Sequence, residues 1–190
     1  SRGLGDVYKR QVFFVPHSTT MFSCPLTSGA MPATVAGCTT QTYSNSPNSV
    51  TVGNGFGYVA GHRNVYSCPL TAGGNLPPVG SCTQATLPNL WHSGLAVTAT
   101  HAYIAGDQGG TVDWCPLTNN VVPSSGSCTS STGFAAPVMT AATSTNVYVS
   151  DGPVVYQCPT TNGAMPASSA GCTYTTGFNN VNGLAMTPSG

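Results

Sequence analysis

Charge is scarce in this sequence. Only 4% of its 190 residues are Asp, Glu, Lys or Arg, and Glu is absent. Three of the four basic residues, Arg2, Lys9 and Arg10, lie in the first ten positions, which leaves Arg63 as the only cation of the remaining chain. A protein so poor in cations neutralises few phosphates, so we expect no nucleic-acid partner. The same shortage argues against binding to an anionic membrane surface.

Long apolar runs and helical periodicity are also lacking. No run approaches the ~20 apolar residues of a membrane-spanning helix, so membrane insertion is not expected. The 23 glycines and 15 prolines interrupt every window that could form a helical stripe. What remains are short β-branched and aromatic runs, such as Tyr58-Val59-Ala60 and Val154-Val155-Tyr156, separated by Gly, Asn, Asp and Pro. This pattern predicts strands and turns, and hence an all-β protein.

The eight cysteines belong to an internal repeat of about 44 residues. The first cysteine of each repeat opens the phrase Cys-Pro-Leu-Thr, or Cys-Pro-Thr-Thr in the last repeat, and Thr follows each second cysteine. With a strand at the second cysteine, each repeat holds four strands. Four-stranded units at this spacing are typical of β-propeller blades. The predicted blades cover residues 12–38, 48–82, 93–128 and 136–172.

The spacing of the cysteines within a repeat predicts how they pair. Cys68 and Cys82 are symmetric about residue 75, where Gly73-Gly74-Asn75 forms a candidate hairpin turn. Facing residues of an antiparallel pair lie close enough for a disulfide after slight local closing. The predicted bridges are Cys24–Cys38, Cys68–Cys82, Cys115–Cys128 and Cys158–Cys172. Each closes a loop of about 15 residues and stabilises the fold by about 3 kcal/mol in the chain-entropy model.

Disulfides indicate an oxidising compartment, so we expect a secreted, cell-surface or periplasmic protein. The alternative of a zinc site lacks the clustered Cys-x-x-Cys spacing that such sites use. No cofactor is predicted.

The two ends of the chain depart from the repeat. Residues 1–11, Ser-Arg-Gly-Leu-Gly-Asp-Val-Tyr-Lys-Arg-Gln, fit no blade and resemble translated sequencing-adapter read-through, so we expect a non-native leader there. Residues 182–190 match a first strand. They either complete the first blade and close a four-bladed ring, or belong to a fragment of a larger propeller whose body is residues 12–190.

The chain resembles the YVTN/NHL-type β-propeller repeats, and in particular the bacterial lactonase-like group. The resemblance lies in strands such as Tyr58-Val59-Ala60-Gly61 and Tyr148-Val149-Ser150-Asp151, which lead into a cysteine-flanked hairpin. It implies a propeller fold; members include lactonases, quinoprotein-like sensors and cell-surface proteins. Propeller lactonases draw metal ligands and bases from Glu, Asp, Asn and His around the axis. Without Glu, and with three aspartates in the body, no catalytic set carries over to this chain.

Candidate site residues lie on the face made by the turns between second and third strands. His17, His62, Asp107 and Asp151 occupy these turns within one residue of equivalent positions, and the connector residues Trp91 and His92 belong to the same face. Converging imidazole and carboxylate groups could bind a metal or supply acid and base. The simpler interpretation is that Asp and His are ordinary turn residues.

The sequence therefore favours a non-catalytic extracellular propeller, acting as a binding scaffold or as a building block of a surface layer or filament. Its expected partners are a protein, a glycan or further copies of itself. A lactonase-like hydrolase using His17, His62, Asp107 and Asp151 is one alternative. A carbohydrate-binding propeller using Trp91 and His92 is another.

Overall fold

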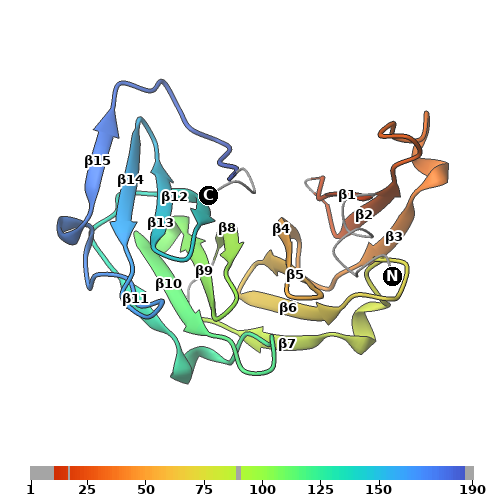
Figure 1. Ribbon diagram of the computed structural model, residues 1–190, viewed down its shortest axis with the longest axis horizontal. Helices are drawn as coiled ribbons and strands as arrows, with labels where there is room; N and C mark the ends of the chain where they lie inside the picture. Colours follow the sequence, from red (N-terminus) through yellow and green to blue (C-terminus); the bar gives the residue numbers. More distant parts are fainter. Residues whose placement is uncertain (1–10, 17, 89–90, 187–190) are drawn as a thin grey trace.

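The computed structural model describes residues 11–16, 18–88 and 91–186. Within these ranges the chain forms fifteen strands and five single-turn 3-10 helices, and no α-helix. The strands make four antiparallel sheets, which Figure 1 shows arranged side by side in an open arc. The prediction of an all-β fold with four repeated sheets is confirmed.

Each sheet is built from consecutive strands. The first contains β1 (Gln11–Phe14), β2 (Thr20–Pro25) and β3 (Thr39–Thr42); the second β4 (Pro47–Gly53), β5 (Phe56–Gly61), β6 (Asn64–Pro69) and β7 (Thr83–Thr86); the third β8 (His92–Val97), β9 (His101–Gly106), β10 (Thr111–Pro116) and β11 (Thr129–Ser131); and the fourth β12 (Pro137–Ala142), β13 (Asn146–Asp151), β14 (Val154–Pro159) and β15 (Thr173–Thr176). The 3-10 helices are η1 (Val35–Gly37), η2 (Val79–Ser81), η3 (Asp107–Gly109), η4 (Ser125–Ser127) and η5 (Ser169–Gly171).

The predicted cysteine pairing is confirmed for all four bridges. The ladder between β6 and β7 ends at the pair Ser67 and Thr83, so Cys68 and Cys82 are the next facing positions. Their Cα atoms are 4.3 Å apart, which is the close spacing of a non-hydrogen-bonded antiparallel pair. Each bridge therefore closes the end of the outer hairpin of its sheet.

The loop inside each bridge has its own local order. In three of the four loops a two-residue turn carries positive φ at both central residues, which are Ser28-Gly29, Asn119-Asn120 and Asn162-Gly163. Asn and Gly tolerate this left-handed conformation, and it gives the tight hairpin turn of type I′. One residue after the turn is followed by an apolar residue and Pro, and then by the 3-10 helix that leads into the second cysteine. These apolar residues are Met31, Leu76, Val122 and Met165.

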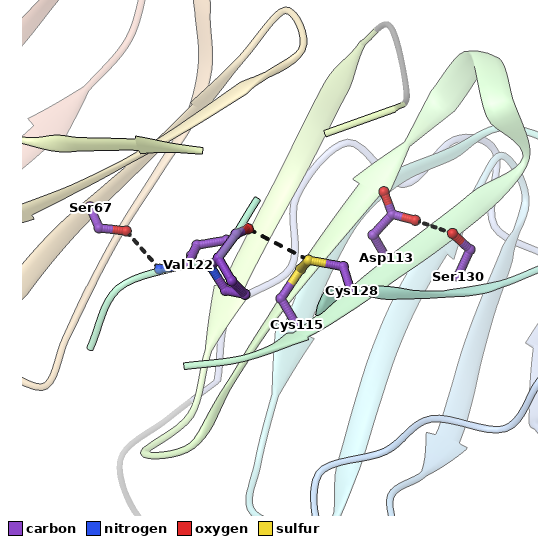
Figure 2. The surroundings of a disulfide bond; sticks show 7 residues. Ser67, Asp113, Cys115, Val122, Cys128 and Ser130 are labelled. Atoms are coloured by element: carbon purple, nitrogen blue, oxygen red, sulfur yellow. Dashed lines mark hydrogen bonds between the residues drawn. A yellow bond between two sulfur atoms is a disulfide. The ribbon is translucent and has the colours of Figure 1, made fainter. Parts of the chain in front are cut away.

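The apolar residue of each later loop packs onto the preceding sheet. Leu76, Val122 and Met165 are 4%, 1% and 6% exposed. Val122, for example, belongs to a cluster with Tyr58 and Val65 of the second sheet. Its backbone N–H also donates a hydrogen bond to Ser67 Oγ at 3.0 Å, as Figure 2 shows beside the Cys115–Cys128 bridge. The disulfide-closed loop thus forms the contact between neighbouring sheets.

Tyrosine hydroxyls add a repeated hydrogen bond across these contacts. Tyr58 Oη donates to the backbone carbonyl of Asn120 at 2.9 Å, and Tyr103 Oη donates to that of Gly163 at 2.8 Å. In both cases the acceptor is the second central residue of the turn in the next loop. Each buried tyrosine ring thus has a hydrogen-bond acceptor for its hydroxyl group in the loop of the following sheet.

Of the two alternatives that the sequence left open, closure of a four-bladed ring is not observed in the described residues. The first sheet has three strands, and β1 pairs with β2 alone. Residues 182–186 form no strand, contrary to the prediction of a first strand at residues 182–190, of which residues 187–190 lie outside the described part. Figure 1 shows the reason: the first and fourth sheets stand at opposite ends of the arc, so these residues do not reach β1.

The disulfide model makes a quantitative prediction. Replacing both Cys68 and Cys82 by Ala should lower the free energy of unfolding by about 3 kcal/mol, because the cross-link restricts the unfolded chain. Replacing Cys115 and Cys128 by Ala should cost the same within error, since the sequence separations are 14 and 13. Urea denaturation followed by circular dichroism measures both. Clearly unequal costs would contradict the chain-entropy explanation.

A second prediction concerns Tyr58. Burial, through desolvation, raises the pKa of its phenol from 10.0 to about 12. The neutral phenol is therefore favoured by folding, and the stability it contributes is present below pH 10 and lost as the pH rises toward 12. Tyr58→Phe should lower the free energy of unfolding by about 0.5–1.5 kcal/mol at neutral pH. It should also reduce the stability lost between pH 10 and 12.

The control for Tyr58 is Tyr174→Phe, because the Tyr174 side chain is 66% exposed. That change should alter the free energy of unfolding by less than about 0.5 kcal/mol. An equal effect of the two substitutions would show that the hydrogen bond to Asn120 adds nothing to stability.

Candidate functional site

A cavity opens where the inner edges of all four sheets converge. Its volume is about 280 Å³. It is lined by Val15 and Pro16 after β1, Pro47 and Asn48 of β4, Trp91, Ser93 and Asp107 of the third sheet and its flanks, and Val138 and Met139 of β12. We call it the axial cavity. Of the residues that the sequence singled out, Trp91 and Asp107 line this cavity.

Trp91 forms one wall of the axial cavity. Its side chain is 37% exposed, and His62 from the turn after β5 contacts it edge to face, with ring centroids 4.6 Å apart and an interplanar angle of 81°. The backbone N–H of Asp107 donates to the carbonyl of Trp91 at 3.3 Å. The connector that carries Trp91 is therefore tied to the turn after β9, which brings the predicted residues His62, Trp91 and Asp107 together.

Asp107 is the polar group of this wall. It is the first residue of η3, directly after β9. Its Oδ1 atom is buried and has no hydrogen-bond partner among the described residues. A buried carboxylate oxygen without a partner is rare, because desolvation without a compensating hydrogen bond costs free energy. Asp107 also lines the axial cavity, which makes its carboxylate the candidate acceptor for a ligand there.

Asp151 has a different role from Asp107. Its carboxylate accepts two backbone hydrogen bonds at 2.7 Å, one from Ala135 N–H and one from Ala136 N–H. It occupies the strand position of Gly106, one residue before that of Asp107, as the ladder pairs Asp151 with Val154 and Gly106 with Thr111. That one-residue offset directs the carboxylate onto the connector before β12, and Asp151 does not line the axial cavity.

The remaining predicted residues are outside this description. His17 lies outside the described residues, and the structure describes the backbone of His92 in β8 but not its side chain. Among the described turn residues, His62 and Asp107 each contact Trp91, and of these two Asp107 lines the axial cavity. Over the described ranges, no group of three or more His, Cys, Asp or Glu side chains is arranged to hold a metal ion.

A second cavity of about 320 Å³ continues along the inner strands from the axial cavity. Met139 lines both, and the second is otherwise bounded by β4, β8, β12 and residues 184–186. Sequence reasoning missed Asn48, Ser93 and Met139 as lining residues. They carry no motif, and the only signal for them is their place at the start of an inner strand.

Part of the titratable chemistry is used in packing between sheets. The His101 ring lies against the loop turn of the fourth sheet, and its desolvation there lowers the pKa of the imidazole. Asp113 is buried and accepts a hydrogen bond from Ser130 Oγ at 2.5 Å, which Figure 2 also shows. Neither residue lines the axial cavity.

Two observations bear on location. Four disulfides among eight cysteines indicate an oxidising, non-cytosolic compartment. In the part of the chain that the structure describes, no helix is long and apolar enough to cross a bilayer.

Comparisons with known proteins identify the fold. No family model matches the chain, and no curated protein does. Solved structures do match. One, described as a 6-phosphogluconolactonase from Bacteroides uniformis ATCC 8492, superposes with a TM-score of 0.61 at 14% identity, over 82% of this chain and 52% of that one. The WD40 domain of Neurospora crassa Pan2 superposes with a TM-score of 0.51 at 9% identity, over 79% of this chain and 46% of that domain.

The chain therefore spans about half the length of the structures it resembles. Identities this low show the fold alone, and the fold is that of a β-propeller built from four consecutive blades.

Proposed function

We propose that this protein is a secreted, non-catalytic binding propeller that holds a neutral, hydroxyl-rich ligand such as a sugar unit in the axial cavity. The observation that carries the proposal is the wall made by Trp91 and Asp107. The Trp91 indole is exposed and contacts His62 edge to face, and it lies beside Asp107, whose buried Oδ1 has no hydrogen-bond partner in the described part of the chain. An apolar ring face with a nearby acceptor suits a sugar ring and its hydroxyl groups.

The size and charge of the cavity support the same class of ligand. A volume of about 280 Å³ lies at the small end of ligand pockets, which suits one or two sugar units rather than a folded partner. The cavity lining contains Asn48 and Ser93 as further polar groups and no Lys or Arg among its described residues. A neutral ligand fits this composition better than a phosphate or a carboxylate.

The non-catalytic part of the proposal is supported by how the carboxylates are used. Asp151, which a hydrolytic mechanism would need beside Asp107, has both oxygens bonded to backbone amides. The pair of carboxylates that glycoside hydrolysis commonly uses is therefore not formed by Asp107 and Asp151. No family model matches the chain. The resemblance to YVTN/NHL repeats is compatible with this proposal, because that group includes cell-surface proteins as well as lactonases.

Binding should depend on Trp91. Trp91→Ala should lower affinity for the best glycan found on an array by at least about tenfold in titration calorimetry, since it removes the aromatic wall. Trp114→Phe is the matched control: Trp114 packs between sheets, its Nε1 has no hydrogen-bond partner within the described ranges, and binding should be unchanged. Absence of glycan binding by the unmodified protein, or turnover of lactones or sugar esters, would overturn the proposal.

The two aspartates should respond differently to loss of charge. Asp151→Asn should lower the free energy of unfolding by about 1–3 kcal/mol, because the new amide group places a donor against a backbone N–H. Asp107→Asn should weaken glycan binding without lowering stability, because the buried oxygen that it replaces makes no hydrogen bond among the described residues. Thermal and urea unfolding measure the first effect and calorimetry the second. A large loss of stability in Asp107→Asn would show that its carboxylate is structural.

A further inference from the structure

The strands β4, β8 and β12, which are the inner strands of the second, third and fourth sheets, share one irregularity near their start. In β4 the ladder with β5 leaves out Asn48, which is an extra residue with no partner. The register shifts in the same way at Ser93 in β8 and at Val138 in β12. An extra residue of this kind is a β-bulge, which bends the strand and changes the direction of a side chain. We call Asn48, Ser93 and Val138 the bulge residues.

All three bulge residues line the axial cavity. Each comes from a different sheet, and each is partly buried. Bulges are common beside binding and active sites because they present a side chain that regular pairing would direct elsewhere. The repeated bulge thus gives the axial cavity one residue from each of these three sheets.

Contacts of the neighbouring residues fix where the bulge residues lie. A Cβ built on Gly94, the residue after Ser93, would lie 2.7 Å from the carbonyl oxygen of Val138, so β8 and β12 approach closely beside their bulges. In the fourth sheet the backbone N–H of Met139, directly after the bulge, donates to Ser150 Oγ at 3.1 Å. The position of a bulge residue is therefore set by its neighbours and not by its own side chain.

The bulge does not require a particular side chain. Its three equivalent positions hold an amide, a hydroxyl and an aliphatic group. None of the three residues has a positive φ, so the backbone conformation does not select the residue type. Within the described part of the chain, the side chains of Asn48 and Ser93 make no hydrogen bond. Side chains that the fold does not use in this way are free to contact a ligand.

Polar and apolar groups reach the axial cavity from different sheets. Asn48 comes from the second sheet, and Ser93 and Asp107 come from the third sheet and its flank. The lining residues from the first and fourth sheets are apolar: Val15, Pro16, Val138 and Met139. A sugar with hydroxyl groups toward the second and third sheets, and a less polar edge toward the fourth, suits both sides of the cavity.

We propose that the bulge residues determine which sugar the axial cavity accepts, an inference that rests on the proposed function. The Asn48 amide and the Ser93 hydroxyl each form a hydrogen bond with a hydroxyl group of the sugar. Val138 disfavours a polar substituent at its edge of the cavity, because that substituent would lose water without gaining a partner. A site that binds a hydroxyl group in this way discriminates against an analogue that lacks it.

The closing experiment uses a glycan array and the monodeoxy analogues of the sugar that the unmodified protein binds best. Asn48→Ala should lower affinity for that sugar about fivefold in titration calorimetry, because one hydrogen bond is lost. One monodeoxy analogue should bind the unmodified protein with a similar loss. Asn48→Ala should bind that analogue and the parent sugar equally, since either change removes the same hydrogen bond. A structural role of Asn48 would not produce this coupling.

A swap variant tests the bulge positions without changing the composition of the cavity. Asn48→Ser combined with Ser93→Asn moves the amide from the second sheet to the third. The melting temperature should stay within about 2 °C, while the order of affinities on the array changes. Gln84→Ala is the matched control for Asn48→Ala. It removes an amide from the exposed face of the outer strand β7, and affinity and order should both be unchanged.

The outcomes separate this inference from the proposed function. If the unmodified protein binds a glycan and the bulge variants keep its affinity and order, the inference is wrong while the proposed function stands on Trp91. If the unmodified protein binds no glycan, the proposed function fails and the inference fails with it. Loss of the folded state in both Asn48→Ala and the swap variant would show that the bulge needs these side chains, which also contradicts the inference.

Discussion

The structure depends on the burial, against the preceding sheet, of one apolar side chain from each of the last three disulfide-closed loops: Leu76, Val122 and Met165. With 4% charged residues, ion pairs cannot organise this fold, and in the described residues no helix provides an apolar face. Packing between sheets must therefore supply the stability. The bridge holds the loop at the end of the outer hairpin, the turn directs it sideways, and residues such as Val122 complete the neighbouring core.

Neighbouring sheets contact each other at their inner strands as well as through the outer loops. A Cβ at Gly94 of β8 would meet the backbone of Met139 in β12 at 2.5 Å, so these two strands pack closely. At the start of the inner strands, Pro47, Trp91 and Val138 lie around an open cavity. At the two ends of the arc, Tyr148 lines an open groove and Met31 is 49% exposed, whereas their counterparts in the middle sheets are buried.

Much of the fold was predictable because each repeat carries local signals, namely the cysteine spacing and the turn residues. The cysteine spacing gave the facing positions in every hairpin, and the register of Ser67 with Thr83 agrees with the predicted centre at residue 75. The candidate site was less predictable. His62, Trp91 and Asp107 do come together. Asp151 does not join them, because a shift of one residue at a strand end turns a side chain toward different neighbours.

The sequence by itself determined the strands, the four repeats and the four bridges, since these follow from periodicity, turn residues and cysteine spacing over fewer than about fifty positions. Tertiary structure alone decided which residues line the axis and whether residues 182–186 reach β1. Those questions depend on the angle between neighbouring sheets, which is set by side-chain packing between repeats. No local sequence pattern specifies these angles, so the sequence does not show whether four sheets close a ring.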